Sequence, residues 1–415
     1  MNELVLWNAT IIDARSAARV EHMCVTVRGE KIAAVRPVDG GQAPESAIDL
    51  GGCYVIPGLI DAHIHLGDDP NMVGDLAVPP LLKGEAPRSR ELVYFVLAKA
   101  ARAFLRSGIT TIRDVGCYDD NAIILREAIR LGLTDGPDIL ACGRIISATA
   151  PGAVLFTSMY EEADGPWEIR RCVRNQLRRG ADYIKVMAGG ARSVVREDPE
   201  PSQLTAEEME ALVDEAHRMG LRVAAHAEGL GAVRLAIVGG VDTIEHGLSL
   251  HRAPELLDHM ARHGTVLVPT LTTFHDVADR LADRFDPRLV EQAKRQREEA
   301  YRTLVAARAA GVTIAMGFDS GPPGADALEL VRMVEGGMSA HEALTAATAG
   351  SARALGLDDR GMIEDGCRAD LVVLNSNPLD DVAALTRPSS FRMVVKAGRI
   401  LAGEPAYRRA ALAVE

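Results

Sequence analysis

Short apolar runs alternate with helical segments through the middle of this 415-residue chain, and this alternation constrains the fold more than any other feature. Strand and helix in alternation are typical of parallel sheets whose faces are covered by helices. Eight such runs are present, beginning near residues 58, 108, 137, 181, 221, 241, 264 and 312. Eight strands close a (β/α)8 barrel. We therefore predict an α/β fold with a (β/α)8 TIM barrel over residues 58–364.

An open doubly wound sheet is the main alternative architecture, but no G-x-G-x-x-G motif follows the first run. The helices between the runs have clear start signals. Thr205 with Glu208, and Ser339 with Glu342, fit the capping box, in which each side chain bonds the other residue's backbone N–H. Gly220 is expected to end the first of these helices.

The two ends of the chain resemble each other and differ from the middle. Both contain short β-branched runs that are separated by Gly, Asp and Asn. This texture is typical of small antiparallel strands. We expect residues 1–57 together with 365–415 to form one small β-sandwich domain next to the barrel.

Charge and composition exclude several classes of partner. The net charge of −12 argues against nucleic acid or an anionic membrane surface as the main partner. The N-terminus has no basic segment typical of a signal peptide, and no apolar run is long enough to span a membrane. The six cysteines are scattered without a C-x-x-C pair, which favours reduced thiols. We expect a cytoplasmic protein, a homo-oligomer, that acts on a small-molecule substrate.

Polar side chains of the metal-binding type stand at the ends of five of the apolar runs. They are His63 and His65 in LIDAHIHL, Lys185 in ADYIKVMAGG, His226 in LRVAAHAEG, His246 in VDTIEHG and Asp319 in VTIAMGFDS. Because the carboxyl ends of barrel strands meet at one face, these side chains are expected to share one site. The long loops 67–90 and 147–167 are expected to shape the pocket at this face. The pattern predicts a metal-dependent hydrolase.

The H-x-H pair places both imidazoles on one side of a strand, because side chains alternate with a period of two. His63 and His65 can therefore chelate one ion, although alternate histidines also occur as structural or surface pairs. Their place at the end of the first barrel strand favours the metal site. Asp61 could orient an imidazole from behind, or it could pack at the strand end.

Lys185 lies between Ile184 and Val186, where a buried ammonium is costly unless it is paired or neutralised. A salt bridge, or a stem that lies along the barrel wall, would be one solution. Reaction with carbon dioxide would be another, because the carbamate is anionic and offers two oxygens. Such a group can bridge two cations about 3.5–4 Å apart. Beside four histidines, the carbamate is the interpretation we favour.

His226 and His246 end two consecutive runs and are neutral nitrogen donors suited to zinc. A single strand histidine is usually hydrogen-bonded in the core, whereas two at consecutive strand ends indicate a shared role. Asp319 can bind one metal ion and accept a proton from water. Its alternative role is a turn or N-cap aspartate ahead of Ser320.

In this order, the motifs resemble those of the amidohydrolase superfamily along nearly the whole chain. The resemblance implies a (β/α)8 barrel with a β-sandwich built from both termini. It also implies a binuclear centre of two divalent ions, zinc by default, with a carboxylated lysine as the bridge. The implied ligands are His63, His65, Lys185, His226, His246 and Asp319.

Within the superfamily, the chain resembles the branch of metal-dependent Xaa-Pro dipeptidases, imidazolonepropionase-like proteins and ochratoxin-type amidases. Arg234 occupies the place of the dipeptidase arginine that binds the substrate carboxylate, a natural bidentate pairing. An exposed helix arginine is the alternative. Glu228 replaces a tyrosine that polarises the carbonyl in those dipeptidases. Since an ionised carboxylate donates no hydrogen bond, we expect Glu228 to bind an amine or amide hydrogen of the substrate.

These expectations combine into hydrolysis of an amide (C–N) bond, of a dipeptide or N-acyl amino acid, by a hydroxide bridging two divalent ions. Asp319 would be the catalytic proton acceptor. The alternatives within the superfamily are a cyclic-amide hydrolase and a mononuclear deaminase, in which Lys185 would be superfluous. A non-catalytic scaffold would require that a ligand be lost, and all six are present.

Overall fold

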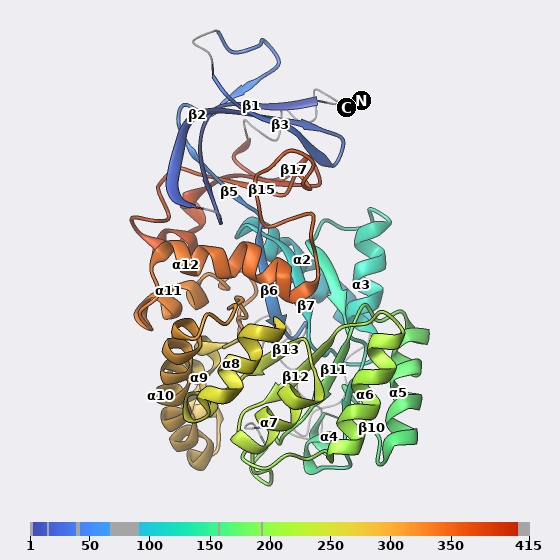
Figure 1. The fold of residues 1–415 in the computed structure, drawn as a ribbon. Coiled ribbons are helices and arrows are strands. Elements are labelled where there is room, and N and C mark those ends of the chain that lie inside the picture. Colours follow the sequence, from blue (N-terminus) through green and yellow to red (C-terminus); the bar gives the residue numbers. More distant parts are fainter. Residues whose placement is uncertain are drawn as a thin grey trace.

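The computed structural model describes residues 3–14, 16–38, 42–66, 91–156, 158–191 and 194–405. Strands from both ends of the chain, blue and red in Figure 1, lie together at one end of the molecule. The middle of the chain forms an α/β part beneath them, with parallel strands and helices. The predicted α/β class is therefore confirmed.

The parallel strands form two sheets, one of three strands and one of six. The first contains β6 (Leu59–Ile64), β7 (Ile109–Asp114) and β8 (Asp138–Ala141). The second has the order β10 (Tyr160–Glu162), β9 (Ile145–Ser147), β11 (Ile184–Met187), β12 (Val223–Ala227), β13 (Thr243–His246) and β14 (Val266–Val268). Seven of the eight predicted runs are thus strands, and β9 and β10 were not predicted.

The eighth predicted run, residues 312–319, is not assigned as a strand, although its backbone bonds both sheets. On one side Ala315 N donates to Leu267 O over 2.9 Å, and on the other Ala62 N donates to Met316 O over 2.8 Å. Gly317 allows the close approach, because a Cβ atom there would lie 2.7 Å from His63 Cβ. Bonds this sparse do not make a ladder, so closure of an eight-stranded barrel stays a prediction.

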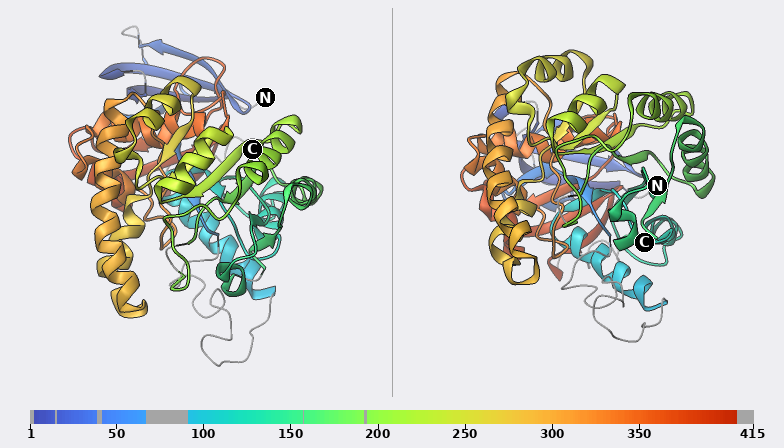
Figure 2. Two further views of the ribbon diagram at one scale, coloured as in Figure 1. Left: turned by 60° about the horizontal axis from the view of Figure 1, so that its bottom comes forward. Right: turned by 90° about the horizontal axis from the view of Figure 1, so that it is seen from below.

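Helices lie mostly at the periphery of the α/β part in both views of Figure 2. They are α2 (Glu91–Arg106), α3 (Asn121–Arg130), α4 (Pro151–Leu155), α5 (Pro166–Arg179), α6 (Ala206–Arg218), α7 (Leu230–Gly239), α8 (Pro254–His263), α9 (Leu271–His275), α10 (Pro287–Ala309), α11 (Leu328–Glu335), α12 (Ala340–Thr345) and α13 (Ser351–Leu355). Both predicted capping boxes are present, at the starts of α6 and α12. Among the described helices, none has the length and apolarity required to cross a bilayer.

Both ends of the chain contribute to one eight-stranded sheet, as the sequence predicted for the termini. Its strands are β1 (Glu3–Asp13), β2 (Ser16–Arg28), β3 (Lys31–Pro37), β4 (Ile48–Asp49), β5 (Tyr54–Pro57), β15 (Leu371–Leu374), β16 (Phe391–Lys396) and β17 (Arg399–Gly403). The ends meet where β5 pairs antiparallel with β15. Because the pairing joins all eight strands in one sheet, the two-layered sandwich and the domain boundaries stay predictions. From β5 the chain runs through Gly58 directly into β6, which contains His63 and ends one residue before His65.

All six cysteines are free thiols. Burial raises the pKa of the Cys172 thiol to about 12, and burial also raises the pKa of Cys142. Thiols that stay protonated are poor nucleophiles and poor metal ligands. Cys142 and Cys172 are therefore packing residues.

Candidate metal centre

Five of the six predicted ligands, together with Glu228, gather into two groups at the carboxyl ends of the strands. His63, His65 and Asp319 form the first group, in which one ligand atom of each lies within 4.8 Å of the others. His226, Glu228 and His246 form the second group by the same measure. The rings of His63 and His246 bring the two groups together, with centroids 5.1 Å apart.

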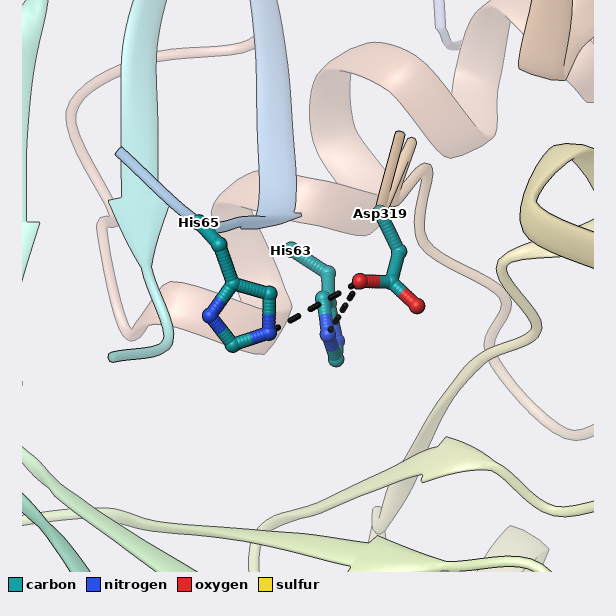
Figure 3. A group of neighbouring side chains, drawn as sticks. All are labelled: His63, His65 and Asp319. Atoms are coloured by element: carbon teal, nitrogen blue, oxygen red, sulfur yellow. Dashed lines mark ion pairs between the residues drawn. The ribbon is translucent and has the colours of Figure 1, made fainter. Parts of the chain in front are cut away.

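The spacing within the first group suits a shared ion. His63 Nε2 lies 3.6 Å and His65 Nε2 lies 3.7 Å from the same oxygen, Asp319 Oδ1 (Figure 3). These separations are too long for hydrogen bonds. Two ligand atoms around one tetrahedral zinc ion, with bonds of roughly 2.0–2.2 Å, lie about 3.4 Å apart. Donor type and spacing therefore both fit a divalent metal ion.

Hydrogen bonds behind the two imidazoles direct their Nε2 atoms at Asp319. His63 Nδ1 lies 2.6 Å from Glu245 Oε2, and His65 Nδ1 lies 2.8 Å from Gly116 O. Metal-binding histidines characteristically donate the second ring N–H to a carboxylate or a carbonyl, which fixes the tautomer and the ring orientation. The first group has this arrangement at both histidines.

Glu245 is a fully buried carboxylate on β13. Burial alone would raise the pKa of Glu245, but the charge of Arg113 and the hydrogen bond with His63 hold it well below its usual range. Arg113 Nη2 donates to Glu245 Oε1 over 2.7 Å. Burial, with the charge of Lys185, lowers the pKa of His63 to about 4. His63 is therefore a neutral imidazole near neutral pH, which is the form that binds metals.

The second group is built on β12 and β13. The rings of His226 and His246 meet edge-on, with centroids 4.6 Å apart, and His246 Nδ1 is hydrogen-bonded to Thr270 Oγ1 over 2.6 Å. His226 Nε2 lies 3.2 Å from Gly190 O and 3.7 Å from Glu228 Oε1. Glu228 Oε2 accepts from Gln296 Nε2 of α10 over 2.8 Å. The sequence predicted that Glu228 contacts the substrate. In the structure, its carboxylate lies within 4.8 Å of the imidazole nitrogens of His226 and His246.

Three non-glycine residues at this face have left-handed backbone conformations. They are His246 (φ 72°), Thr270 (φ 48°) and Asp319 (φ 45°). Such conformations persist where the surrounding structure fixes them, and they cluster at active sites and ligand-binding turns. Asp319 is held by its own N–H, which donates to His63 O over 2.9 Å. The ligand-bearing turns are therefore held in place by backbone contacts as well as by side chains.

Lys185 lies on β11 and is almost completely buried, with 2% of its surface exposed. It pairs with Ala224 of β12, two residues before His226. Burial lowers the pKa of Lys185 to about 8, although the charges of Glu245 and Asp319 oppose this shift. Its charge acts on His63 and on Asp319, which couples Lys185 electrostatically to the first group. A buried lysine with a lowered pKa is readily available as a neutral amine.

The other predicted residues lie in different surroundings. Arg234 is half exposed on α7, and its Nη2 donates to Glu255 Oε1 of α8 over 2.7 Å. Among the described residues, Asp61 makes no hydrogen bond to an imidazole ring. Its Oδ1 instead accepts from the backbone N–H groups of His63 (2.9 Å) and Phe318 (3.2 Å). Asp61 thus ties the first strand to the eighth run.

Of the two loops expected to shape the pocket, residues 67–90 lie outside the described residues. The second loop, 147–167, contains α4 and β10, and its residue 157 is not described. A cavity of about 910 Å³ lies near the amino ends of the strands, lined by residues such as Arg222, Asp242 and Thr265. None of the six predicted ligands lines it. The candidate centre is therefore separate from this cavity.

With this geometry established, comparison with known proteins identifies the family. Residues 54–401 match the amidohydrolase family. The chain belongs to the amidohydrolase family. The resemblance inferred from the strand-end motifs is therefore confirmed, and the protein is a hydrolytic enzyme that acts on C–N bonds.

Relatives of this amidohydrolase match most of its length. Ochratoxinase from Aspergillus niger is 32% identical over 381 residues, covering 84% of this chain and 76% of that protein. Imidazolonepropionase from Paracoccus denitrificans is 29% identical over 354 residues, covering 78% and 80%. The crystal structure of a Xaa-Pro dipeptidase with bound methionine in the active site is 31% identical, covers 97% of this chain and 100% of that one, and has a TM-score of 0.85.

Sequence reasoning missed the residues that hold the predicted ligands in place. Glu245 and Arg113 are charged residues inside buried apolar runs, the same signal that marked Lys185, and it could have found them. Gln296 had no such signal, because it lies in the middle of the 23-residue helix α10 with no motif around it.

Proposed function

We propose that this amidohydrolase cleaves an amide bond of a dipeptide or an N-acyl amino acid at a centre of two divalent ions. The observation that carries the proposal is the pair of histidine and carboxylate groups at the carboxyl ends of the strands, joined by the contact between His63 and His246. Zinc is the default ion for such nitrogen and oxygen donors, although manganese or cobalt would also fit. The names of the relatives support the amide class of substrate.

Lys185 is proposed to complete the centre as a carbamate. Its neutral amine would form an N–C bond to carbon dioxide and release one proton. The product carries a negative charge and two oxygens, so it can serve two ions at once. Burial of Lys185 beside Asp319 and His63 supports this role, because an uncompensated ammonium would be costly there.

When bound, two divalent ions would lower the pKa of water enough to supply hydroxide near neutral pH, and they would polarise the scissile carbonyl. Asp319 is proposed to accept the proton at a carboxylate oxygen and to return it to the leaving nitrogen. The bond from Asp319 N to His63 O fixes the backbone that carries this carboxylate. Glu245 keeps His63 oriented for the metal rather than for proton transfer.

Arg234 is proposed to bind the substrate carboxylate after exchanging its present partner. Both side chains of the ion pair with Glu255 are exposed, Arg234 at 49% and Glu255 at 58%. Pairs of this kind contribute about 0–1 kcal/mol, so a substrate carboxylate could replace Glu255 at little cost. Replacement of Arg234 by leucine should raise KM for substrates with a free carboxylate and leave their amides unaffected.

Four further expectations stay proposals. Residues 312–316 are proposed to close the two parallel sheets into a (β/α)8 barrel, since they bond both sheets. The shared terminal sheet supports a sandwich domain of residues 1–57 and 365–415. Free thiols at all six cysteines fit a cytoplasmic location. A homo-oligomeric state is proposed with them.

The test is a screen of N-acyl amino acids and dipeptides against zinc-loaded protein, with metal counted by mass spectrometry. Two ions per chain and release of a free amino acid are the expected result. A single tightly bound ion, with ammonia released from an amino-substituted ring, would instead favour the mononuclear deaminase. Ring opening of cyclic imides without cleavage of linear substrates would favour the cyclic-amide hydrolase. Failure of every linear amide with two ions bound would contradict the proposal.

A further inference from the structure

We propose that Glu228 is itself a metal ligand, supplying a carboxylate oxygen to the second ion beside His226 and His246. This inference rests on the proposed binuclear function and assigns a role to a residue that replaces the tyrosine of the related dipeptidases. It also changes the role expected from sequence, in which Glu228 contacts an amine or amide hydrogen of the substrate.

The first argument is the spacing of the donor atoms. Glu228 Oε1 lies 3.7 Å from His226 Nε2. The corresponding distances from Asp319 Oδ1 to His63 and His65 in the first group are 3.6 and 3.7 Å. All three exceed hydrogen-bond length and suit two ligands on one ion, which lie roughly 3.4 Å apart around tetrahedral zinc. The second group therefore matches the first in this spacing, and His226 Nε2 would exchange its contact with Gly190 O for the ion.

The second argument is the orientation of the carboxylate. Gln296 Nε2 donates to Glu228 Oε2 over 2.8 Å, and the atom nearer His226 is the other oxygen, Oε1. Gln296 is itself buried, and its Oε1 has no hydrogen-bond partner among the described residues. A buried amide left half satisfied is costly, so the orientation of Gln296 serves its bond to Glu228. Carboxylates that bind metals are typically oriented by such a hydrogen bond.

The third argument is charge. Glu228 has only 1% of its surface exposed, and buried charges in proteins are paired or coordinate metals. Without Glu228, the second group offers two imidazoles and no carboxylate, whereas the first offers two imidazoles and the carboxylate of Asp319. With Glu228, each ion receives two histidines and one carboxylate from the protein. This symmetry would balance charge between the two ions before Lys185 bridges them.

The experiment compares Glu228→Gln with Glu215→Gln. Glu215 is an equally buried glutamate that is bound by Arg170 and Arg174, so its substitution is the same chemical change away from the site. Zinc stoichiometry is measured after dialysis, and zinc affinity by competition with a chromophoric chelator. We expect two ions in the wild-type protein and in Glu215→Gln. In Glu228→Gln the affinity for one ion should fall about 10–100-fold, while the other stays bound.

Gln296→Met provides a second variant that keeps the carboxylate and removes its hydrogen-bond donor. We expect its affinity for the same ion to fall by about tenfold. The visible spectrum of the cobalt-substituted protein should change in both variants, because it reports the ligands directly. This variant also tests the proposal if Glu228→Gln fails to fold.

Two zinc ions bound to Glu228→Gln with wild-type affinity would overturn the ligand role, and a selective loss of amine-bearing substrates in that variant would return Glu228 to substrate binding. That outcome leaves the proposed binuclear function intact. Fewer than two ions in the wild-type protein would instead overturn the binuclear function, and the role of Glu228 with it.

Discussion

At the scale of single residues, charges buried at the carboxyl ends of the strands compensate one another. Arg113 and Glu245 have 3% and 0% of their surfaces exposed and bond each other, and Glu245 in turn orients His63. The ion pair thus has a positional role, because it fixes the imidazole that faces Asp319. A buried pair of this kind tolerates loss of one partner poorly.

Replacing Glu245 with glutamine should therefore affect folding and metal binding together. The change leaves the Arg113 guanidinium buried without its anion, which costs about 3–5 kcal/mol. It also loosens His63, so the affinity for the ion of the first group should fall about 10–100-fold. Urea unfolding of metal-free protein and a zinc titration measure the two effects. Glu335→Gln, which breaks an exposed pair with Arg332, is the control, and equal unfolding midpoints for the two variants would contradict this account.

Replacing Lys185 with alanine should remove metal and activity in one step, because no carbamate can form. Lys396→Ala removes a comparably buried lysine of the terminal sheet and should keep both ions. In the wild-type protein the neutral amine is the form that reacts with carbon dioxide. Since the pKa of Lys185 is about 8, reactivation of CO2-free apoprotein by zinc at a fixed concentration of dissolved carbon dioxide should accelerate as pH rises from 7 to 8. Hydrolysis by Lys185→Ala at the wild-type rate would rule out the carbamate.

Residues at strand ends were the part of the site that the sequence predicted best. His63, His226 and Asp319 each follow an apolar run, so their place at the carboxyl ends follows from parallel topology alone. The partners behind them could not be predicted in the same way. The hydrogen-bonded residues Glu245 and His63 are 182 positions apart in the sequence, and Gln296 and Glu228 are 68 positions apart. Such contacts depend on strand order and helix rotation, which local patterns leave open.

At the scale of elements, a pair of buried carboxyl groups connects β6 to the segment before α11. Asp61 on β6 and Asp326 are both fully buried, and Asp61 Oδ2 and Asp326 Oδ1 have no hydrogen-bond partner among the described residues. One proton held between the two carboxyl groups would satisfy both oxygens. Burial raises the pKa of Asp326 to about 6, and burial together with the charge of Asp326 raises that of Asp61 well above its usual range. The pair therefore holds a proton in the folded protein that the unfolded chain releases.

Asp326→Asn should change the pH dependence of stability. The unfolded-state pKa is 3.8 and the folded value of Asp326 is about 6, so the wild-type protein loses stability as pH rises between these values. The asparagine amide donates a permanent N–H to Asp61 in place of the shared proton. As pH rises from 4 to 6, the free energy of unfolding of the variant should increase by about 2–3 kcal/mol relative to that of the wild-type protein. Urea unfolding of metal-free protein across this range tests it, and parallel profiles for the two proteins would argue against a shared proton.

The eighth predicted run is the one predicted strand that the structure does not assign as a strand. Its apolar pattern resembles that of the other seven, yet residues 312–319 form only scattered bonds to β14 and β6. Gly317 packs against His63 and Val268, and Asp319 has a left-handed φ, so the backbone bends where a ladder would continue. The sequence predicts an apolar run here, but the bend depends on neighbours far away in the chain.

At the scale of the whole molecule, one carboxylate connects the terminal sheet to the α/β part. Asp138 begins β8, at the end of that strand opposite to the metal groups. Its oxygens lie 2.7 Å from Lys396 Nζ, 2.9 Å from Arg360 Nη1 and 3.2 Å from Arg368 Nη2. Burial alone would raise the pKa of Asp138, but these three charges lower it. The carboxylate thus stays ionised and neutralises three cations from the C-terminal part of the chain.

Asp138→Asn should weaken this connection without disturbing the metal centre. Three largely buried cations would lose their anion, and we expect a loss of about 2 kcal/mol at neutral pH. Because the folded pKa is depressed, the stabilisation exists above the unfolded value of 3.8 and is lost as pH falls below it, so the difference from wild type should narrow in acid. Asp365→Asn, which breaks an exposed pair with Arg36, should cost less than about 1 kcal/mol. Thermal unfolding at pH 7 and pH 3, with zinc counted on the folded protein at pH 7, checks these values. Loss of zinc from folded Asp138→Asn would mean that the terminal sheet acts on the site itself.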